Sequence, residues 1–234
     1  MTTSPVIVAL DVESAAEARN LISALGDSAS FYKVGMELYA SAGMEFVREL
    51  KSQGKRVFLD LKFYDIGETV RRAVAQVARV GVDFLTVHGS QAVMQAAVAG
   101  RGDSALKLLA VTVLTSFDES DLLQMGYPCS VSDLVALRVG NAKTAGIDGI
   151  VCSPMEVSRV RGISGPQAIL VTPGVRSAGA STGDQKRVAT PGEAIANGAD
   201  YLVMGRQVTR AADPRAEMLR VLEEIKTAGV PIKA

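Results

Sequence analysis

Eight short apolar runs recur along the chain, and this repeat is the feature that most constrains its fold. Most of the runs are rich in Val, Ile and Leu and are too short for helices. They are typical of strands that are buried on both faces of a parallel sheet. The predicted strands are Val6–Leu10, Phe31–Gly35, Val57–Leu61, Phe84–Val87, Leu108–Leu114, Gly149–Cys152, Ala168–Thr172 and Tyr201–Met204.

Signals that start and end helices lie between these runs. Four segments have the Ser/Thr-x-x-Glu pattern of a capping box, which satisfies free N–H groups of a first helical turn. Asp213 before Pro214 is a similar start, and Gly81, Gly146 and Gly198 stand where a helix would end before the next strand. The predicted capping boxes are Ser14–Glu17, Ser116–Glu119, Ser153–Glu156 and Thr190–Glu193, with Pro154 and Pro191 at the first helical position.

Strands that alternate with helices over 234 residues predict an α/β protein with the fold of a (β/α)8 TIM barrel. The alternative is a doubly wound open sheet, which usually binds a nucleotide at a glycine-rich turn after its first strand. Here the first strand is followed by Asp11, Val12 and Glu13 without a glycine, which favours the barrel. No linker or change of composition divides the chain, so we expect residues 1–234 to form a single domain.

The composition argues against several classes of partner. A balance of 25 basic and 25 acidic side chains leaves no basic excess for nucleic acid. The longest stretch without a charged side chain, Phe84–Gly100, is broken by polar residues, so no membrane partner is expected. Cys129 and Cys152 lack Cys-x-x-Cys spacing, which predicts neither a disulfide framework nor a zinc site. With no signal-peptide pattern at the N-terminus, the chain is expected to be cytoplasmic.

Charged residues at the ends of the early strands form the first candidate site. Barrels of this kind carry their active sites at the carboxyl ends of the strands, where Asp11, Lys33, Asp60, Lys62 and Asp65 are expected. Asp60 and Lys62 share one face of their strand because side chains alternate. A structural ion pair is the alternative, but two lysines and three carboxylates converging on one mouth favour a catalytic site.

A second candidate site follows the last two strands, whose loops often bind phosphate in barrel enzymes. Pro173 and Arg176 follow the seventh strand, and Gly205 and Arg206 follow the eighth. Each arginine can hold phosphate oxygens with two parallel hydrogen bonds. The alternative is a pair of solvated surface arginines. Gln185, in the small and polar segment between these strands, is a further candidate for phosphate contact.

For each of two more polar residues, the sequence allows two interpretations. His88, the one histidine of the chain, ends the fourth strand, where a lone histidine is more often a core residue than a catalytic group. No second His or Cys stands at ligand spacing, so no metal site is predicted. Thr115 follows the fifth strand, where hydroxyls would either bind the polar edge of a substrate or cap the next helix.

Taken together, these segments resemble the bacterial type of the orotidine 5′-monophosphate decarboxylase family over nearly the whole chain. The most specific part is the Asp-x-Lys-x-x-Asp motif of Asp60, Lys62 and Asp65, which sugar-phosphate enzymes of the same superfamily share. The combination with five other segments makes the resemblance strong. These are Ala9–Asp11, Lys33–Leu38, Val171–Arg176, Asp184–Pro191 and Val203–Arg206.

The resemblance implies a homodimer with shared active sites that converts orotidine 5′-monophosphate to UMP and carbon dioxide, the last step of UMP synthesis, without metal or organic cofactor. It implies that Lys62 delivers the proton to C6, that Asp60 lies against the substrate carboxylate and that Asp65 comes from the partner subunit. Lys33 would complete this charged array. The other implied substrate contacts are Asp11 and Lys33 at the ribose, Thr115 at the pyrimidine, Ile66 and Thr69 across the dimer, and Pro173, Arg176, Gln185, Gly205 and Arg206 around the phosphate.

Two alternatives remain at this point. Sister enzymes of the superfamily act on 3-keto sugar phosphates through a magnesium-stabilised enediolate, and they typically carry a metal-binding Glu where this sequence has Lys33. A lysine there would repel the ion. The other alternative is a barrel that binds a nucleotide as a sensor, which would not require the intact Asp60, Lys62 and Asp65 array.

Overall fold

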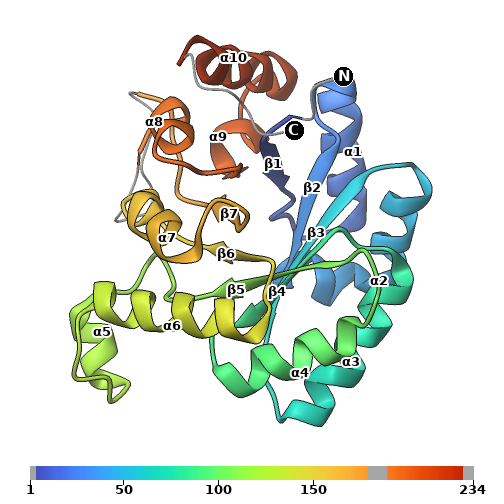
Figure 1. Cartoon of the computed structure of the whole chain (residues 1–234). Coiled ribbons are helices and arrows are strands. Elements are labelled where there is room, and N and C mark those ends of the chain that lie inside the picture. Colours follow the sequence, from blue (N-terminus) through green and yellow to red (C-terminus); the bar gives the residue numbers. More distant parts are fainter. Residues whose placement is uncertain (1–3, 179–188, 229–234) are drawn as a thin grey trace.

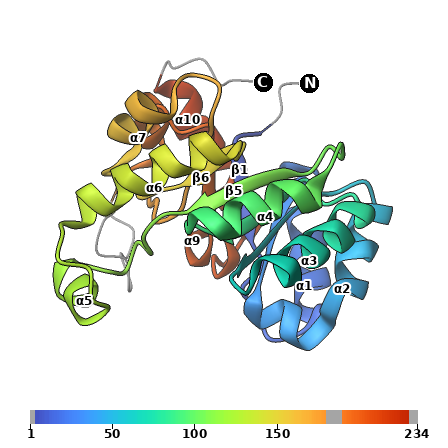
Figure 2. The same ribbon diagram turned by 60° about the horizontal axis from the view of Figure 1, so that its bottom comes forward.

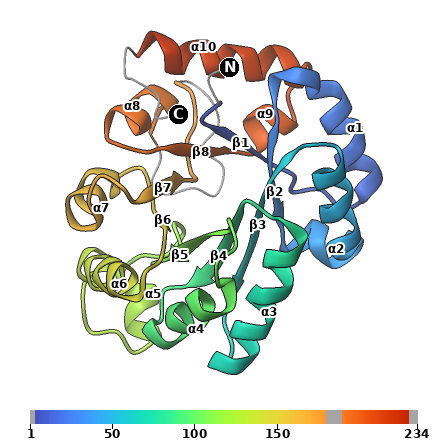
Figure 3. The same ribbon diagram turned by 45° about the vertical axis from the view of Figure 1, so that its right-hand side comes forward.

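The computed structural model describes residues 4–178 and 189–228. In these residues, eight parallel strands close into one barrel in sequence order, and the helices surround it (Figure 1, Figure 3). The strands are β1 (Val6–Ala9), β2 (Phe31–Gly35), β3 (Arg56–Phe63), β4 (Phe84–His88), β5 (Lys107–Val111), β6 (Gly149–Val151), β7 (Ile169–Thr172) and β8 (Tyr201–Met204). The helices are α1 (Ala15–Leu25), α2 (Met36–Ser52), α3 (Gly67–Val80), α4 (Gln91–Arg101), α5 (Glu119–Gln124), α6 (Val131–Ala145), α7 (Val157–Ser164), α8 (Pro191–Ala196), α9 (Arg206–Thr209) and α10 (Pro214–Thr227).

The predicted (β/α)8 barrel is confirmed, and each predicted strand is found with small changes at its ends. The largest change is in β5, which ends at Val111 rather than at Leu114. Its neighbours β4 and β6 place their last paired residues, His88 and Val151, opposite Val111. The residues after Val111 therefore have no residues of β4 or β6 to pair with, and they form the loop that leads to α5.

Two of the predicted helix starts are wrong and the others are confirmed. At α5 the N-cap is Asp118 rather than Ser116, because the Asp118 carboxylate accepts two backbone N–H groups and Asp121 completes the capping box. At α7 the helix begins after Glu156, whose carboxylate accepts the Ser153 N–H across a turn. Pro154 therefore precedes the helix. The confirmed caps are Ser14, Thr190 with Pro191, and Asp213 with Pro214.

Alternation along the strands separates two apolar layers. The smaller layer points into the barrel and contains Phe31, Phe58 and Phe84 among its members. The side chains between them point outward and pack beneath the helices in one large cluster. This alternation decides which polar residues, further along the same strands, face the inside of the barrel.

The amino-terminal end of the barrel is closed by Arg56. Its guanidinium carbon lies 4.0 Å from the centre of the Phe31 ring and 5.3 Å from that of Tyr201. Phe84 meets both rings edge to face. Such contacts combine apolar burial with the attraction between a cation and an aromatic face. The interior is thus filled at this end, and its polar side chains gather at the other.

The α5 helix lies at the periphery, on the connection between β5 and α6 (Figure 2). Within residues 4–178 and 189–228, no helix combines the length and the apolar character that a bilayer crossing would need.

Candidate active site

The carboxyl ends of β1, β2 and β3 bring three charged residues into one row. Lys33 follows Phe31 on the inner face of β2, and Asp60 follows Phe58 on the inner face of β3. Asp11 comes two residues after Ala9, the last residue of β1. Because parallel strands end at the same rim of the barrel, these side chains meet above the apolar interior.

The row consists of lysines and carboxylates in alternation. Lys33 Nζ lies 2.7 Å from Asp11 Oδ1 and 3.9 Å from Asp60 Oδ2. Lys62 Nζ lies 3.0 Å from Asp60 Oδ1. The exposed fractions of the Lys33 and Asp60 side chains are only 10% and 16%. A charge this deeply buried is stable only when it is paired, and Asp60 is paired on both sides.

Lys62 sits at a break in the regular strand. Among the described residues it is the one non-glycine residue with a positive φ, 49°, and the register between β3 and β4 shifts between Leu59 and Phe63. A lysine in this region of backbone space costs about 1–3 kcal/mol, which the surrounding structure must offset. The Lys62 N–H donates to Thr86 Oγ1 at 2.9 Å, and the same hydroxyl donates to Asp60 Oδ1 at 2.9 Å.

Asp65, Ile66 and Thr69 lie outside this row in a single protomer. All three are exposed, and the Asp65 carboxylate accepts the N–H of Ile66 at 2.6 Å. In the part of the chain that the structure describes, no ion pair joins Asp65 to the lysines. Tyr64 and Ile66 expose 68% and 73% of their surface on either side of Asp65. The segment thus presents a carboxylate between two apolar side chains to the outside of the protomer.

The charged row borders an open cleft of about 430 Å³. On one side its lining includes Asp11 and Lys33, and on the other Arg176 and Arg206. Burial lowers the pKa of the Arg176 guanidinium from its ordinary value, and the charge of Arg206 lowers it further. An anion bound between the two guanidinium groups would offset this repulsion. Pro173 and Gly205 complete the predicted phosphate side of the lining.

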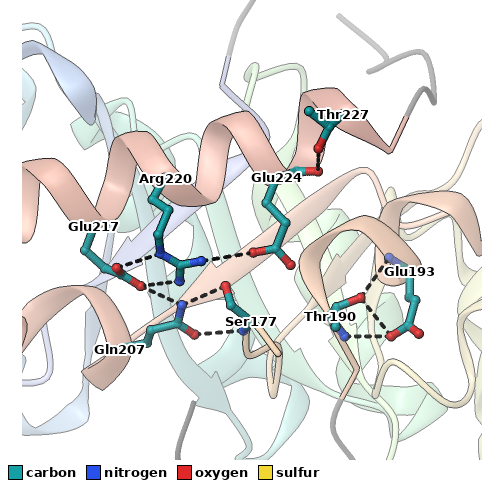
Figure 4. A network of polar contacts seen from close by, with 8 residues as sticks. All are labelled: Ser177, Thr190, Glu193, Gln207, Glu217, Arg220, Glu224 and Thr227. Atoms are coloured by element: carbon teal, nitrogen blue, oxygen red, sulfur yellow. Dashed lines mark hydrogen bonds and ion pairs between the residues drawn. The ribbon is translucent and has the colours of Figure 1, made fainter. Parts of the chain in front are cut away.

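A polar network holds the two arginine-bearing segments together (Figure 4). Gln207, in α9, donates to Ser177 Oγ at 2.8 Å and to Glu217 Oε1 at 2.7 Å, and it accepts the Ser177 N–H at 3.0 Å. Glu217, in α10, also holds Arg220. Because Ser177 follows Arg176 and Gln207 follows Arg206, this network joins the two backbone segments that carry the arginines.

Some of the predicted residues are not brought to this cleft. Gln185 lies outside the described residues. Thr115 lies in the connection between β5 and α5, half-buried. His88, at the end of β4, stacks on Tyr64 with ring centres 4.2 Å apart. Burial lowers the pKa of His88 and nearby Arg138 lowers it further, so its neutral form is favoured.

Two residues at the site were not anticipated from the sequence. Thr86 looked like one more β-branched core residue of an apolar strand, although a hydroxyl among Phe84, Leu85 and Val87 was a signal worth noting. Gln207 stood next to a predicted phosphate ligand and carried no motif of its own. Both act through contacts with segments distant in sequence, which spacing alone does not reveal.

A second groove, of about 480 Å³, lies away from this row, against α2 and α3. Its lining includes Arg48 and Lys51, which pair with Glu45 and Asp83 at 3.8 and 2.6 Å. These cations already have partners, and no strand end reaches the groove. The cleft at the barrel mouth is therefore the candidate active site.

In the described residues, no group of three or more His, Cys, Asp or Glu side chains is arranged to hold a metal ion.

A known protein family matches this chain over most of its length. The model of the orotidine 5′-phosphate decarboxylase / HUMPS family matches residues 4–221. The chain belongs to this family. The match includes both the charged row and the arginine side of the cleft.

Individual relatives of the family cover nearly the whole chain. A protein of Rhodopseudomonas palustris named orotidine 5′-phosphate decarboxylase is 54% identical over 219 residues, which are 94% of this chain and 93% of the relative. One of Methylobacterium nodulans with the same name is 52% identical over 97% of this chain and 99% of its own. A crystal structure of orotidine 5′-phosphate decarboxylase from Lactobacillus acidophilus superposes with a TM-score of 0.83 at 36% identity, covering 95% of this chain and 99% of that one.

Proposed function

We propose that this protein decarboxylates orotidine 5′-monophosphate to UMP and carbon dioxide, with Lys62 as the proton donor. The observation that carries the proposal is Asp60 held between Lys33 and Lys62, with Lys33 lining the same cleft as Arg176 and Arg206. A phosphate on the arginine side would direct the pyrimidine of a nucleotide toward the charged row. The family and its relatives support the same substrate.

The reaction needs a cation beside one carbon atom. When the bond between C6 and the carboxylate breaks, carbon dioxide leaves and the electron pair stays on C6, where the ring delocalises it poorly. The Lys62 ammonium stabilises this developing charge and then transfers a proton to C6, which forms UMP. Asp60, 3.0 Å from Lys62 Nζ, pairs with the ammonium group and fixes its position. This is electrostatic preorganisation, in which the charges are placed before the substrate arrives.

The substrate's other groups take the remaining positions. Asp11 and Lys33 would hold the ribose hydroxyls, Thr115 the pyrimidine edge, and Arg176, Arg206 and Gly205 the phosphate, with Pro173 beside it. Gln185 would reach the phosphate from outside the described residues. Binding energy from the distant phosphate lowers the barrier at C6 only if it orders the charged array. The network of Gln207, Ser177 and Glu217 holds together the segments that carry Arg176 and Arg206 on the phosphate side.

The proposed enzyme is a homodimer with shared active sites. Asp65 would extend the row Lys33, Asp60, Lys62 of the neighbouring protomer, and Ile66 and Thr69 would reach the same substrate. The exposure of Tyr64 and Ile66 around Asp65 supports an interface here, because exposed apolar side chains grouped together mark contact surfaces. A carboxylate at the centre of this patch then meets the free side of Lys62.

The proposed reaction uses neither a metal nor an organic cofactor. Lys33 Nζ occupies the space between the carboxylates of Asp11 and Asp60, where a magnesium ion would have to bind in an enzyme that acts on 3-keto sugar phosphates. An ammonium there repels a divalent cation. We also infer that the protein works in the cytoplasm, and the two free cysteines agree with a reducing compartment.

An ultraviolet assay with orotidine 5′-monophosphate in EDTA tests the proposal. We expect conversion to UMP by the wild-type protein, and a loss of at least about a thousandfold in kcat for Lys62→Ala, because both the charge and the proton are removed. UMP binding should remain measurable. Lys226→Ala is the control, since Lys226 lies on α10 with 77% of its side chain exposed. A folded wild-type protein that is inactive here but converts 3-keto sugar phosphates with magnesium would overturn the proposal.

A further inference from the structure

We propose that Thr86 is a positioning residue for the decarboxylation, one that fixes Asp60 and the backbone of Lys62 through a single hydroxyl. The inference rests on the proposed function, since it assigns Thr86 a role in the same site. Thr86 would not touch the substrate. It acts through the two residues that do.

The placement of Thr86 follows from the alternation of β4. Phe84 points into the barrel, so Thr86 points inward two residues later, at the level where Asp60 emerges from β3. Its side chain is completely buried, with 0% exposed. A hydroxyl in such a place must be hydrogen-bonded to avoid a large loss of hydration.

The hydroxyl uses both of its hydrogen-bonding capacities on the reactive pair. It accepts the Lys62 N–H at 2.9 Å and donates to Asp60 Oδ1 at 2.9 Å. The same Oδ1 accepts from Lys62 Nζ at 3.0 Å. The three groups therefore form a closed ring of contacts, in which a hydroxyl that accepts and donates at once favours a single arrangement.

Each of these contacts fixes one group of the site. The backbone of Lys62 leaves the strand with a positive φ of 49°, and its N–H finds Thr86 where the ladder between β3 and β4 shifts. The carboxylate of Asp60 is free to turn about its last bond unless a donor fixes one oxygen. With Oδ1 fixed by Thr86, Oδ2 is left on the side of Lys33, at 3.9 Å. Thr86 thereby sets which oxygen serves which lysine.

This role predicts an effect on turnover rather than on affinity. Binding of the phosphate depends on Arg176 and Arg206 at the far side of the cleft, which Thr86 does not reach. The alignment of Lys62 with C6 depends on Asp60, so a freely turning carboxylate would lower kcat and leave KM nearly unchanged.

The experiment compares Thr86→Val, Thr86→Ala and Thr86→Ser in the full-length protein. Valine keeps the shape and removes the hydroxyl, and serine keeps the hydroxyl. We expect Thr86→Val and Thr86→Ala to lower kcat by about a hundredfold, with KM and the Kd of UMP within about threefold of wild type. Thr86→Ser should restore most of the rate. Thr172→Val is the matched control, a fully buried threonine one residue after inward-facing Val171.

Several results would overturn the inference. Full kcat in Thr86→Val or Thr86→Ala would remove the hydroxyl from the mechanism. Equal losses in kcat and in UMP binding would reduce Thr86 to a structural role. If Thr86→Val does not fold, the kcat of Thr86→Ala compared with that of Thr86→Ser tests the role of the hydroxyl. A wild-type protein without decarboxylase activity would instead refute the proposed function, and that result is visible before any variant is made.

Discussion

At the scale of single residues, His88 has an environment that favours its neutral form. It stacks on Tyr64, and its Nδ1 is buried without a hydrogen-bond partner among the described residues. Burial lowers the pKa of His88 below its ordinary value of 6.5, and Arg138 lowers it further. The sequence left its role open, and this packing is that of a core residue at the rim of the barrel.

The lowered pKa of His88 predicts a loss of stability in mild acid. Below about pH 6.5 the unfolded chain binds a proton at this histidine before the folded protein does, so the free energy of unfolding falls as the pH decreases. The contribution is fully present above this range. Urea unfolding of wild type and His88→Gln at pH 7.5 and 5.5 measures it. The chain has no other histidine, so the glutamine variant should lose much less stability between these two pH values. An equal loss in both proteins would contradict the prediction.

At the scale of elements, the contact between α3 and α4 depends on a missing side chain. A Cβ built at Gly100, in α4, would lie 2.2 Å from the backbone oxygen of Arg71 in α3. Gly140, in α6, would meet nothing within 4 Å. The first glycine lets two helices approach closely, and the second carries only the entropic disadvantage of glycine in a helix.

These two glycines predict opposite effects of the same substitution. Gly140→Ala should raise the free energy of unfolding by about 0.5–1 kcal/mol, because alanine restricts the unfolded chain and favours the helix. Gly100→Ala should lower it by about 1–3 kcal/mol, because the helices must move apart. Urea midpoints at one protein concentration give the comparison. A stabilised Gly100→Ala protein would show that α3 and α4 are not held at this distance.

At the scale of the whole molecule, one protomer keeps Asp65 apart from the other charged residues of the predicted array. Lys33, Asp60 and Lys62 meet within the barrel, whereas Asp65 points outward beside exposed Tyr64 and Ile66. The proposed dimer would supply each site with an aspartate from the other subunit. Activity would then belong to the pair of chains rather than to either one.

Mixing inactive variants tests this shared site. Lys62→Ala and Asp65→Ala carry their defects in different protomers of each site, so a hybrid dimer has one site with both defects and one intact site. After subunit exchange, half of the dimers are hybrids, and one of the two sites in each hybrid is intact. We therefore expect about a quarter of all sites to be active. A mixture of Lys62→Ala and Asp60→Ala is the control, because every hybrid site keeps one defect. Absence of recovery, with exchange verified, would place Asp65 outside the partner's site.

The sequence alone determined the barrel and much of its site, because both follow from local periodicity. Short β-branched runs with helices between them specify parallel strands, and alternation within a strand specifies that Asp60 follows Phe58 on the inner face. The positions of Arg176 and Arg206 follow from their places just after β7 and β8. The start of α5 was missed because the Asp118 carboxylate caps this helix in place of Ser116. The start of α7 was missed because Ser153 and Glu156 form a turn that precedes the helix.

The tertiary structure decided everything that depends on which residues of different strands stand side by side. The shifted register between β3 and β4 brings Thr86 to Asp60 and Lys62. The packing of α9 and α10 brings Gln207 to Ser177 and Glu217. Residue spacing carries no information about such pairs, since their distance is set when the barrel closes and its helices pack. The sequence therefore determined which chemical groups reach the mouth of the barrel, and closure of the fold decided how they are held.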